Sequence, residues 1–144
     1  MIYKHTQTGY LIIFALLAEV LLFVIILAQA DFNSIILAIM LFILFILVSF
    51  ASLTVMIDEN YLRIKFGYGI FRKRFILREI ISVRAVKNHW YYGWGIRFWL
   101  WPRMVIFNVS GLGAVEIKMK NGKTYRIGTD EPKNLEHAII QVIK

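Results

Sequence analysis

The chain has 144 residues, of which 59% are hydrophobic and 15% aromatic, with a formal net charge of +8 at pH 7. Its mean hydropathy of +0.64 is too high for an ordinary soluble protein. The lack of cysteine excludes disulfide frameworks, zinc–thiolate sites, iron–sulfur clusters and cysteine nucleophiles. Of the 17 Lys and Arg and nine Asp and Glu, only Lys4, Glu19 and Asp31 precede Met56, so the net positive charge belongs to the later part.

Two long apolar runs occupy the amino-terminal part. Residues 10–30 match the roughly 20 residues that cross ~30 Å of hydrocarbon, and residues 34–52 lie in an uncharged stretch. The first run exceeds the usual apolar length of a signal peptide, so we expect it to remain in the chain. Because residues 29–33 leave only a short connection, residues 1–52 are predicted to form an antiparallel transmembrane hairpin.

The distribution of basic residues predicts the orientation of this hairpin. Lys4 precedes the first run and every other Lys and Arg follows the second, whereas the connection contains Asp31. By the positive-inside rule, both termini are expected in the cytoplasm of a multi-pass protein of the cell (inner) membrane.

Glu19 lies near the middle of the first run, where an acidic side chain costs a few kcal/mol on insertion scales. Residues 42–48 of the second run, at matching depth, are all apolar, and Ser49 is the nearest polar side chain. Two interpretations stay open. Glu19 contacts a membrane protein partner or a second copy, or it is a neutral carboxyl bonded to a helix backbone.

Strand patterns replace the continuous apolar runs from Leu53 onward, with no flexible linker between. Strands are expected on both sides of a turn at 58–60 and then at 71–77, 81–87, 104–109, 114–120 and 123–128. Asn121-Gly122 is a strong hairpin signal because both residues tolerate the positive φ of a type I′ turn. After Asp130 and Pro132, an apolar stripe predicts a closing amphipathic helix.

About seven strands closed by one helix form the pattern of a pleckstrin-homology-like (PH-like) fold. The stretches that carry a resemblance are IDENYLRIKFGYGIFRKRFILREIISV, YYGWGIR and NVSGLGAVEIKMKNGKTYRIGTDEP. They resemble bacterial PH-like domains that follow transmembrane helices in small membrane proteins. The resemblance implies an α+β membrane protein in which residues 53–144 form a PH-like antiparallel β-barrel or sandwich of about seven strands with a C-terminal helix.

Candidate catalytic and metal-binding residues are sparse. None of the histidines, His5, His89 and His137, has a second ligand at suitable spacing on its own element. Gly111-Leu112-Gly113 is no nucleotide-binding loop because no helix follows it. We therefore expect no enzyme activity, no catalytic residue, no metal and no cofactor.

The segment 89–103 contains all four tryptophans and is the first candidate surface. Trp and Tyr concentrate at membrane interfaces, and arginines can face lipid phosphates. The residues expected at a membrane or partner surface are Trp90, Tyr91, Tyr92, Trp94, Arg97, Trp99, Trp101 and Arg103. The alternative is that every second residue from Trp94 to Leu100 fills the inside of a small barrel.

The second candidate surface is the basic cluster Arg72, Lys73 and Arg74. Its spacing from Lys65 resembles the Lys-x(n)-Arg-x-Arg signature of phosphoinositide-binding PH domains, although here it lies on the second turn instead of the first. Basic residues near an anionic leaflet contribute roughly 1 kcal/mol each, which would orient the domain toward headgroups. The alternative is a solvated strand face. Nucleic acid is not expected, since anionic lipid accounts for the basic charge.

The predicted function is a non-enzymatic, membrane-anchored interaction or scaffold module with its PH-like domain at the inner membrane face. Two alternatives stay open. In the first, the chain is a bacteriocin-immunity or envelope-stress protection protein whose hairpin and Glu19 engage an intruding peptide or a membrane partner. In the second, it is an accessory subunit of a lipid-metabolism or transport complex.

Overall fold

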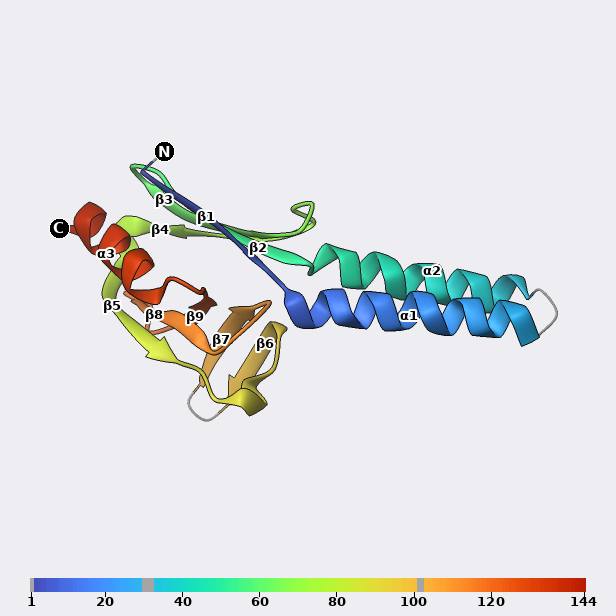
Figure 1. The fold of residues 1–144 in the computed structure, drawn as a ribbon. Coiled ribbons are helices and arrows are strands. Elements are labelled where there is room, and N and C mark those ends of the chain that lie inside the picture. The colour runs from blue at the N-terminus through green and yellow to red at the C-terminus, as the bar shows by residue number, and fades with distance from the viewer. Residues whose placement is uncertain (1, 30–32, 101–102) are drawn as a thin grey trace.

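The computed structural model describes residues 2–29, 33–100 and 103–144, and two helices project from one end of its β-rich part (Figure 1). The elements follow the order β1 (Tyr3–Thr8), α1 (Tyr10–Gln29), α2 (Ser34–Ser49), β2 (Ser52–Ile57), β3 (Tyr61–Phe66), β4 (Phe71–Ile76), η1 (Leu77–Glu79), β5 (Ile80–Lys87), η2 (Trp90–Tyr92), β6 (Gly95–Leu100), β7 (Arg103–Asn108), β8 (Gly113–Met119), β9 (Thr124–Gly128) and α3 (Pro132–Ile143). Both chain ends lie at the end of the β-rich part away from the helices (Figure 1).

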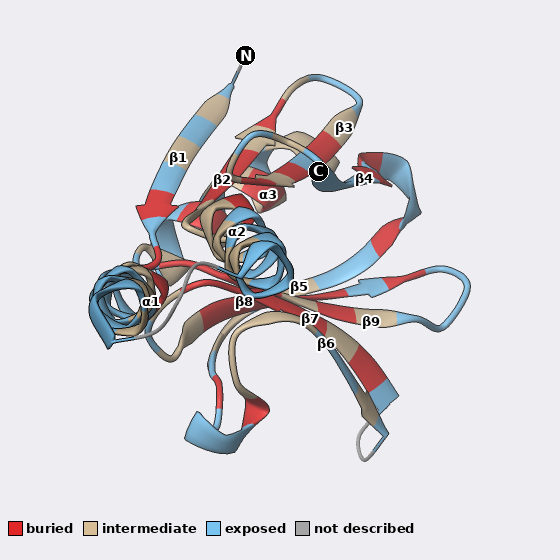
Figure 2. Ribbon diagram, turned by 90° about the vertical axis from the view of Figure 1, so that its right-hand side faces the viewer, coloured by how far each residue is buried: buried red, intermediate tan, exposed pale blue. Residues whose placement is uncertain are grey.

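The strands form two sheets. Sheet A has the order β1-β2-β3-β4, and sheet B has the order β5-β8-β9-β7-β6. All paired neighbours are antiparallel except β7 and β9, which run parallel. The inner faces of both sheets bury apolar side chains such as Phe66, Ile117 and Ile127, and Figure 2 shows these buried positions concentrated in the strands. The helix α3 packs on β5, β8 and η1 and adds Leu135 and Ile139 to the same core.

The predicted fold class is therefore wrong. We expected a transmembrane hairpin of two helices followed by one PH-like barrel or sandwich of about seven strands. Over the described ranges, the strands instead form two separate sheets with free edges and no closed barrel. The reason is that sequence periodicity does not show which distant strands pair. An example is the parallel pairing of β7 with β9, in which Val105 lies opposite Tyr125.

The strand β1 was also not predicted, because its sequence YKHTQT lacks the apolar alternation of a half-buried strand. It pairs with β2 along its whole length, from Tyr3 opposite Ile57 to Thr8 opposite Ser52. The Tyr3 hydroxyl donates to Glu131 Oε2 at 3.3 Å. Burial, reinforced by this carboxylate, raises the pKa of the Tyr3 phenol far above its usual value, so the hydroxyl stays a donor.

The helices α1 and α2 lie side by side as direct continuations of β1 and β2 (Figure 1). Only Gly9 separates β1 from α1, and its N–H donates to the Ala51 carbonyl at 2.7 Å. A Cβ at Gly9 would lie 3.1 Å from the Val109 carbonyl oxygen, so a larger residue would be crowded there. The start of α2 is capped by Asn33, whose Oδ1 accepts the Ile35 N–H at 2.9 Å.

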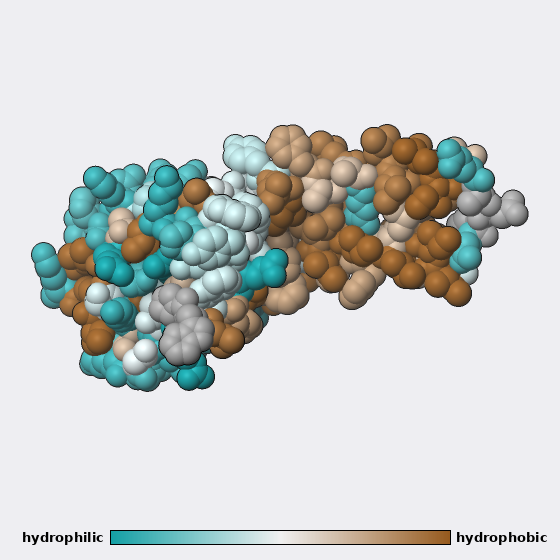
Figure 3. Space-filling model, turned by 90° about the horizontal axis from the view of Figure 1, so that it is seen from below, coloured by the Kyte–Doolittle hydropathy of each residue, from teal (hydrophilic) through white to brown (hydrophobic). Residues whose placement is uncertain are grey.

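The two helices differ in length. The 20 residues of α1 are long and apolar enough to cross a membrane, a property that spans and signal sequences share. The apolar α2 has 16 residues and ends at Ser49, because the chain from Ser52 onward is the strand β2. The second span was expected to reach residue 52, so its end was predicted later in the chain than the observed end of α2 at Ser49. Figure 3 shows a mostly hydrophobic surface over the helical pair and a mostly hydrophilic one over the sheets.

Candidate functional site

The structure divides the aromatic segment 89–103 into a buried and an exposed part. Tyr92 is buried, and the Trp99 ring packs beside it with a centroid distance of 4.8 Å. Trp90 and Tyr91, in contrast, are 75% and 50% exposed. Of these four aromatic residues, Trp90 and Tyr91 are therefore the ones available as a surface for lipid or a partner.

The other predicted residues of this segment lie apart from that pair. Trp94 is half-buried, and its carbonyl accepts the Nε–H of Arg97 at 3.0 Å. Arg103 is exposed at the start of β7. Trp101 lies outside the described residues. Arg97 thus fixes the turn at Trp94, a structural role that its position in the sequence did not indicate.

The buried part of the segment covers an ion cluster on the outer face of sheet B. The Glu116 carboxylate is only 5% exposed and lies 3.0 Å from both Arg84 Nη2 and Arg126 Nε. Arg126 also donates to Asn88 Oδ1 at 3.2 Å, and its guanidinium lies 5.6 Å from the Tyr92 ring centroid. These charges are satisfied within the fold. Tyr92 therefore has a structural role, sealing this cluster.

The strand β6 carries apolar side chains on its other face. Ile96, Phe98 and Leu100 share that face by strand alternation, and Phe98 and Leu100 are 77% and 76% exposed. The alternative that every second residue fills a barrel is therefore wrong for these two. The physical reason is that β6 is the edge strand of sheet B and has a neighbouring strand on one side only.

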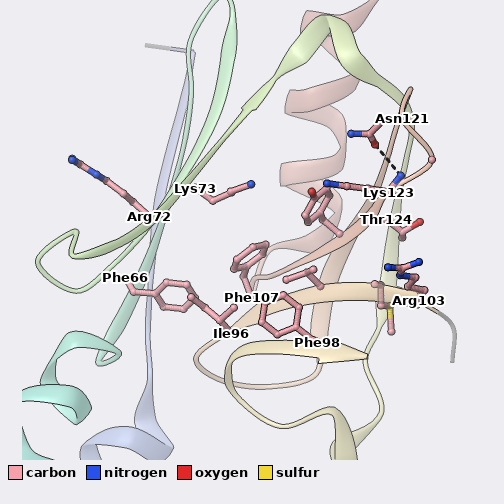
Figure 4. Close-up of a pocket in the computed structure, with 14 residues that line it drawn as sticks. Phe66, Arg72, Lys73, Ile96, Phe98, Arg103, Phe107, Asn121, Lys123 and Thr124 are labelled. Carbon is pink, nitrogen blue, oxygen red and sulfur yellow. Dashed lines mark hydrogen bonds between the residues drawn. The ribbon is translucent and has the colours of Figure 1, made fainter. Parts of the chain in front are cut away.

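A groove of about 730 Å³ opens between the two sheets beside this face of β6 (Figure 4). This volume lies within the range of small-molecule sites. Phe66 of β3, Ile96 and Phe98 of β6, and Phe107 of β7 supply its apolar surface, and Tyr125 of β9 lies beside them. The groove is thus built from strands of both sheets, which is why sequence position gave no sign of it.

Among the residues that the structure describes, four basic ones line this groove and no acidic one does. Arg72 and Lys73 come from β4, Arg103 from β7, and Lys123 from the turn between β8 and β9. Figure 4 shows Lys73 and Lys123 pointing toward one another from opposite sheets, whereas Arg72 points away from the interior. The Lys73 ammonium lies 5.8 Å from the Tyr125 ring centroid. The groove therefore combines an apolar surface with positive charge.

The three residues of the predicted basic cluster do not share one face of β4. Arg72 and Arg74 project from the outer face of sheet A, and Lys73 projects from the inner face with Phe75. On the outer face, Arg74 lies opposite Arg63, an unfavourable pairing of like charges. Of the two that Figure 4 draws, Lys73 points into the groove and Arg72 points away from it.

Asp58 and an aromatic ring offset part of this repulsion. Arg63 forms an ion pair with Asp58 at 3.0 Å, and the Arg74 guanidinium lies 4.7 Å from the Tyr61 ring centroid. The Asp58 carboxylate accepts the N–H groups of Asn60 and Tyr61 at 2.9 and 2.8 Å. These two hydrogen bonds, with Arg63, hold the pKa of Asp58 below its usual value.

The turn between β3 and β4 is a surface that sequence reasoning missed. Gly67 packs on the end of α2, where a Cβ would lie 2.7 Å from the Ser49 carbonyl oxygen. Tyr68 and Ile70 are 69% and 53% exposed, and the turn lies beside α2 in Figure 1. Exposed apolar and aromatic side chains beside the end of an apolar helix suit a membrane interface. The glycines indicated a turn, but nothing in their spacing showed that it lies beside the helix.

Glu19 faces the second helix. Both carboxylate oxygens are inaccessible to solvent and have no hydrogen-bond partner in the described part of the chain. It lines a small pocket between the helices together with Met40 and Leu44 of α2. The interpretation of a carboxyl bonded to the helix backbone therefore does not hold. Contact with another chain stays a prediction.

His5 gains neighbours that its own element did not indicate. Its Nε2 lies 2.5 Å from Asp130 Oδ1, and its Nδ1 lies 3.6 Å from Glu131 Oε2. Within residues 2–29, 33–100 and 103–144, no group of three or more His, Asp or Glu side chains is arranged to hold a metal ion. The His5 contacts therefore serve to join β1 to the start of α3.

Comparison of the chain with protein-family models, with curated proteins and with solved structures finds no match. The resemblance to bacterial PH-like membrane proteins thus stays a prediction.

Proposed function

We propose that the chain is a non-enzymatic interaction module anchored in a membrane by α1, with its two sheets held at the bilayer surface. One observation carries this proposal. The apolar side chains of α1 and α2 remain exposed along the helical pair because the sheets do not cover them (Figures 2 and 3). An apolar surface of this extent requires a cover, and hydrocarbon suits helices that are apolar on all sides.

The finer proposal is that α2 returns through the same membrane. The Gly9 N–H is bonded to the Ala51 carbonyl, so the start of α1 and the end of α2 are held together. If α1 crosses, α2 has to come back to the same side. Its 16 residues extend about 24 Å, and local thinning of the bilayer accommodates a short helix. With Lys4 and the other basic residues on that side, both termini are cytoplasmic and the protein is multi-pass.

The surface that meets the headgroups follows from this orientation. Tyr68 and Ile70 lie beside α2, and Trp90 and Tyr91 are exposed in the connection between β5 and β6. These side chains suit the interfacial layer, where aromatic rings and polar handles are both satisfied. The bilayer, including anionic headgroups, is therefore the first partner we propose, and a membrane protein or second copy is the next.

The lack of native cysteine makes a labelling experiment direct. Single-cysteine variants Gln29→Cys, Ile25→Cys and Lys144→Cys are treated with a membrane-impermeant maleimide in intact and in permeabilised cells. Labelling of Gln29→Cys in intact cells, of Lys144→Cys only after permeabilisation, and of Ile25→Cys in neither supports the proposed topology. Labelling of residues 29 and 144 both in intact cells, or both only after permeabilisation, would contradict it. Release of the chain by alkaline carbonate would contradict the membrane anchor itself.

The unpartnered Glu19 carboxyl favours a second candidate function, protection against membrane-active peptides. An intruding helix could donate hydrogen bonds to Glu19 within the apolar layer, where such bonds are otherwise missing. Cells that lack the chain are challenged with such peptides and complemented with wild type or Glu19→Leu. Rescue by wild type alone supports this candidate. Equal rescue by both proteins would contradict a role for Glu19. A lack of rescue by either protein would contradict the protective function itself.

A further inference from the structure

The groove between the sheets leaves positive charge without an acidic partner. Elsewhere in the fold, Arg84 and Arg126 share Glu116, and Arg63 is paired with Asp58. None of the groove residues forms an ion pair with a carboxylate over the described ranges. The four basic residues of the groove therefore lie around an apolar surface with no carboxylate among its described lining residues.

Lys73 and Lys123 define where an anion would bind. They come from different sheets and point toward one another across the groove (Figure 4). Two ammonium groups that face one another repel, and an anion between them turns this repulsion into two attractive contacts. The backbone of the turn is fixed beneath Lys123, whose N–H donates to Asn121 Oδ1 at 2.9 Å. The site for negative charge is thus partly preformed.

The apolar part of the groove lies toward the helices. In Figure 4, Phe66, Ile96 and Phe98 lie nearer to α1 and α2 than the two lysines do. A series of aromatic rings joins this part to the helical pair. The Phe50 ring, just after α2, lies 5.0 Å from Phe66, which lies 6.3 Å from Phe107. The groove therefore runs from an apolar end beside the proposed membrane to a cationic end farther out.

We propose that this groove holds one anionic phospholipid taken from the bilayer, with its phosphate between Lys73 and Lys123 and an acyl chain along Ile96 and Phe98. This inference rests on the membrane location proposed above. The apolar end of the groove lies beside the membrane and the cationic end lies farther out. A lipid could therefore enter the groove headgroup first, along its own long axis and without reversing its orientation. It also gives a reason for the exposure of Phe98 at the groove.

The test uses the full chain purified in mild detergent. Phosphatidylglycerol or phosphatidylcholine with identical acyl chains is added, and native mass spectrometry measures the fraction of chains that retain one lipid. The charge variant is Lys73→Gln with Lys123→Gln. Its matched control, Lys87→Gln with Lys118→Gln, loses the same charge at exposed positions that do not line the groove. Phe98→Ser is compared in the same way with Ile81→Ser, another exposed apolar residue outside the groove.

We expect wild type to retain phosphatidylglycerol in preference to phosphatidylcholine. The groove charge variant should lower phosphatidylglycerol retention roughly tenfold, since each lysine beside an anionic headgroup contributes substantially to binding. The matched charge control should behave as wild type. Phe98→Ser should lower retention of the lipid while Ile81→Ser does not. Circular dichroism and thermal unfolding of each variant establish that the fold is kept.

Equal retention by the groove variant and its control overturns the proposal, as does equal retention of the two lipids by wild type. These outcomes are distinct from failure of the proposed function. A chain that resists carbonate extraction but shows no selective lipid retention is a membrane protein without a lipid site in this groove. If the chain retains phosphatidylglycerol but is released by carbonate, the lipid site in the groove is supported and the membrane anchor is contradicted. The proposal that the lipid comes from the bilayer is then contradicted as well.

Discussion

The space between the two sheets is closed by α3 at one side and open as a groove at the other. Leu135 and Ile139 of α3 have no exposed surface, whereas Phe98 and Leu100 of β6 keep about three quarters of theirs, 77% and 76%. All four are large apolar side chains that alternate or repeat as core residues do. The same spacing of large apolar side chains therefore stabilises the fold where another element covers them. Where no element covers them, these side chains are free to contact a ligand.

The largest expected effect is at the closed side. Leu135→Ala removes a fully buried side chain and leaves a cavity, so we expect the free energy of unfolding to fall by about 2 to 5 kcal/mol. Urea unfolding of the full chain in mild detergent, followed by tryptophan fluorescence, measures this change. All four tryptophans lie in residues 90–101, so the signal reports on the sheets. A loss below about 1 kcal/mol would show that α3 does not close the core.

The ion cluster under the aromatic segment should give the next largest effect. Glu116→Gln leaves Arg126 largely buried without its full charge partner, and we expect a loss of about 2 to 3 kcal/mol. Unchanged stability would contradict the structural role assigned to this cluster. Glu116→Met combined with Arg126→Met removes both buried groups and should recover part of the loss, which separates an unpaired charge from poor packing.

The open side should respond in the opposite way. Phe98→Ala removes a side chain that is already in contact with solvent, so we expect unfolding free energy within about 0.5 kcal/mol of wild type. The same urea titration measures it, with Leu135→Ala as the reference for a buried position. A loss comparable to that of Leu135→Ala would remove the contrast between the two sides and make Phe98 part of the core.

The smallest effect concerns the exposed turn at Asp58. Its pKa is lower in the folded chain than in the unfolded one, so its contribution to stability is present above its usual pKa and is lost as the pH falls through the lowered value. Below about pH 4, wild type should therefore lose stability more steeply than Asp58→Asn. Thermal unfolding between pH 5 and pH 3 compares the two. Parallel curves would contradict the hydrogen bonds assigned to this carboxylate.

Much of the local structure could be predicted from the sequence. The Asn121-Gly122 turn lies between β8 and β9 as expected, and Pro132 begins the closing helix α3. The strand β1 could not be found, since the one buried residue among its six is the polar Gln7. The end of α2 was placed too late because the residues around Phe50 are as apolar as those of a helix or a strand.

The groove was harder to foresee than the strands that build it. Alternation placed Ile96 and Phe98 on one face correctly, but only tertiary structure decides whether another sheet covers that face. The separate role of Lys73 could have been found from the sequence. It lies two residues before the apolar Phe75 and so shares its inward face, whereas Arg72 and Arg74 point outward.

The direct continuation of β1 into α1 and of α2 into β2 joins the anchor and sheet A as one stiff unit. No flexible linker lies at either junction, where Gly9 is bonded to Ala51. Six residues of strand extend about 20 Å. A helix tilt of roughly 20°, common in bilayers, would therefore move the outer tip of the sheet by about 7 Å. Since bilayer thickness sets tilt, a thinner or thicker membrane would raise or lower the groove relative to the lipid headgroups.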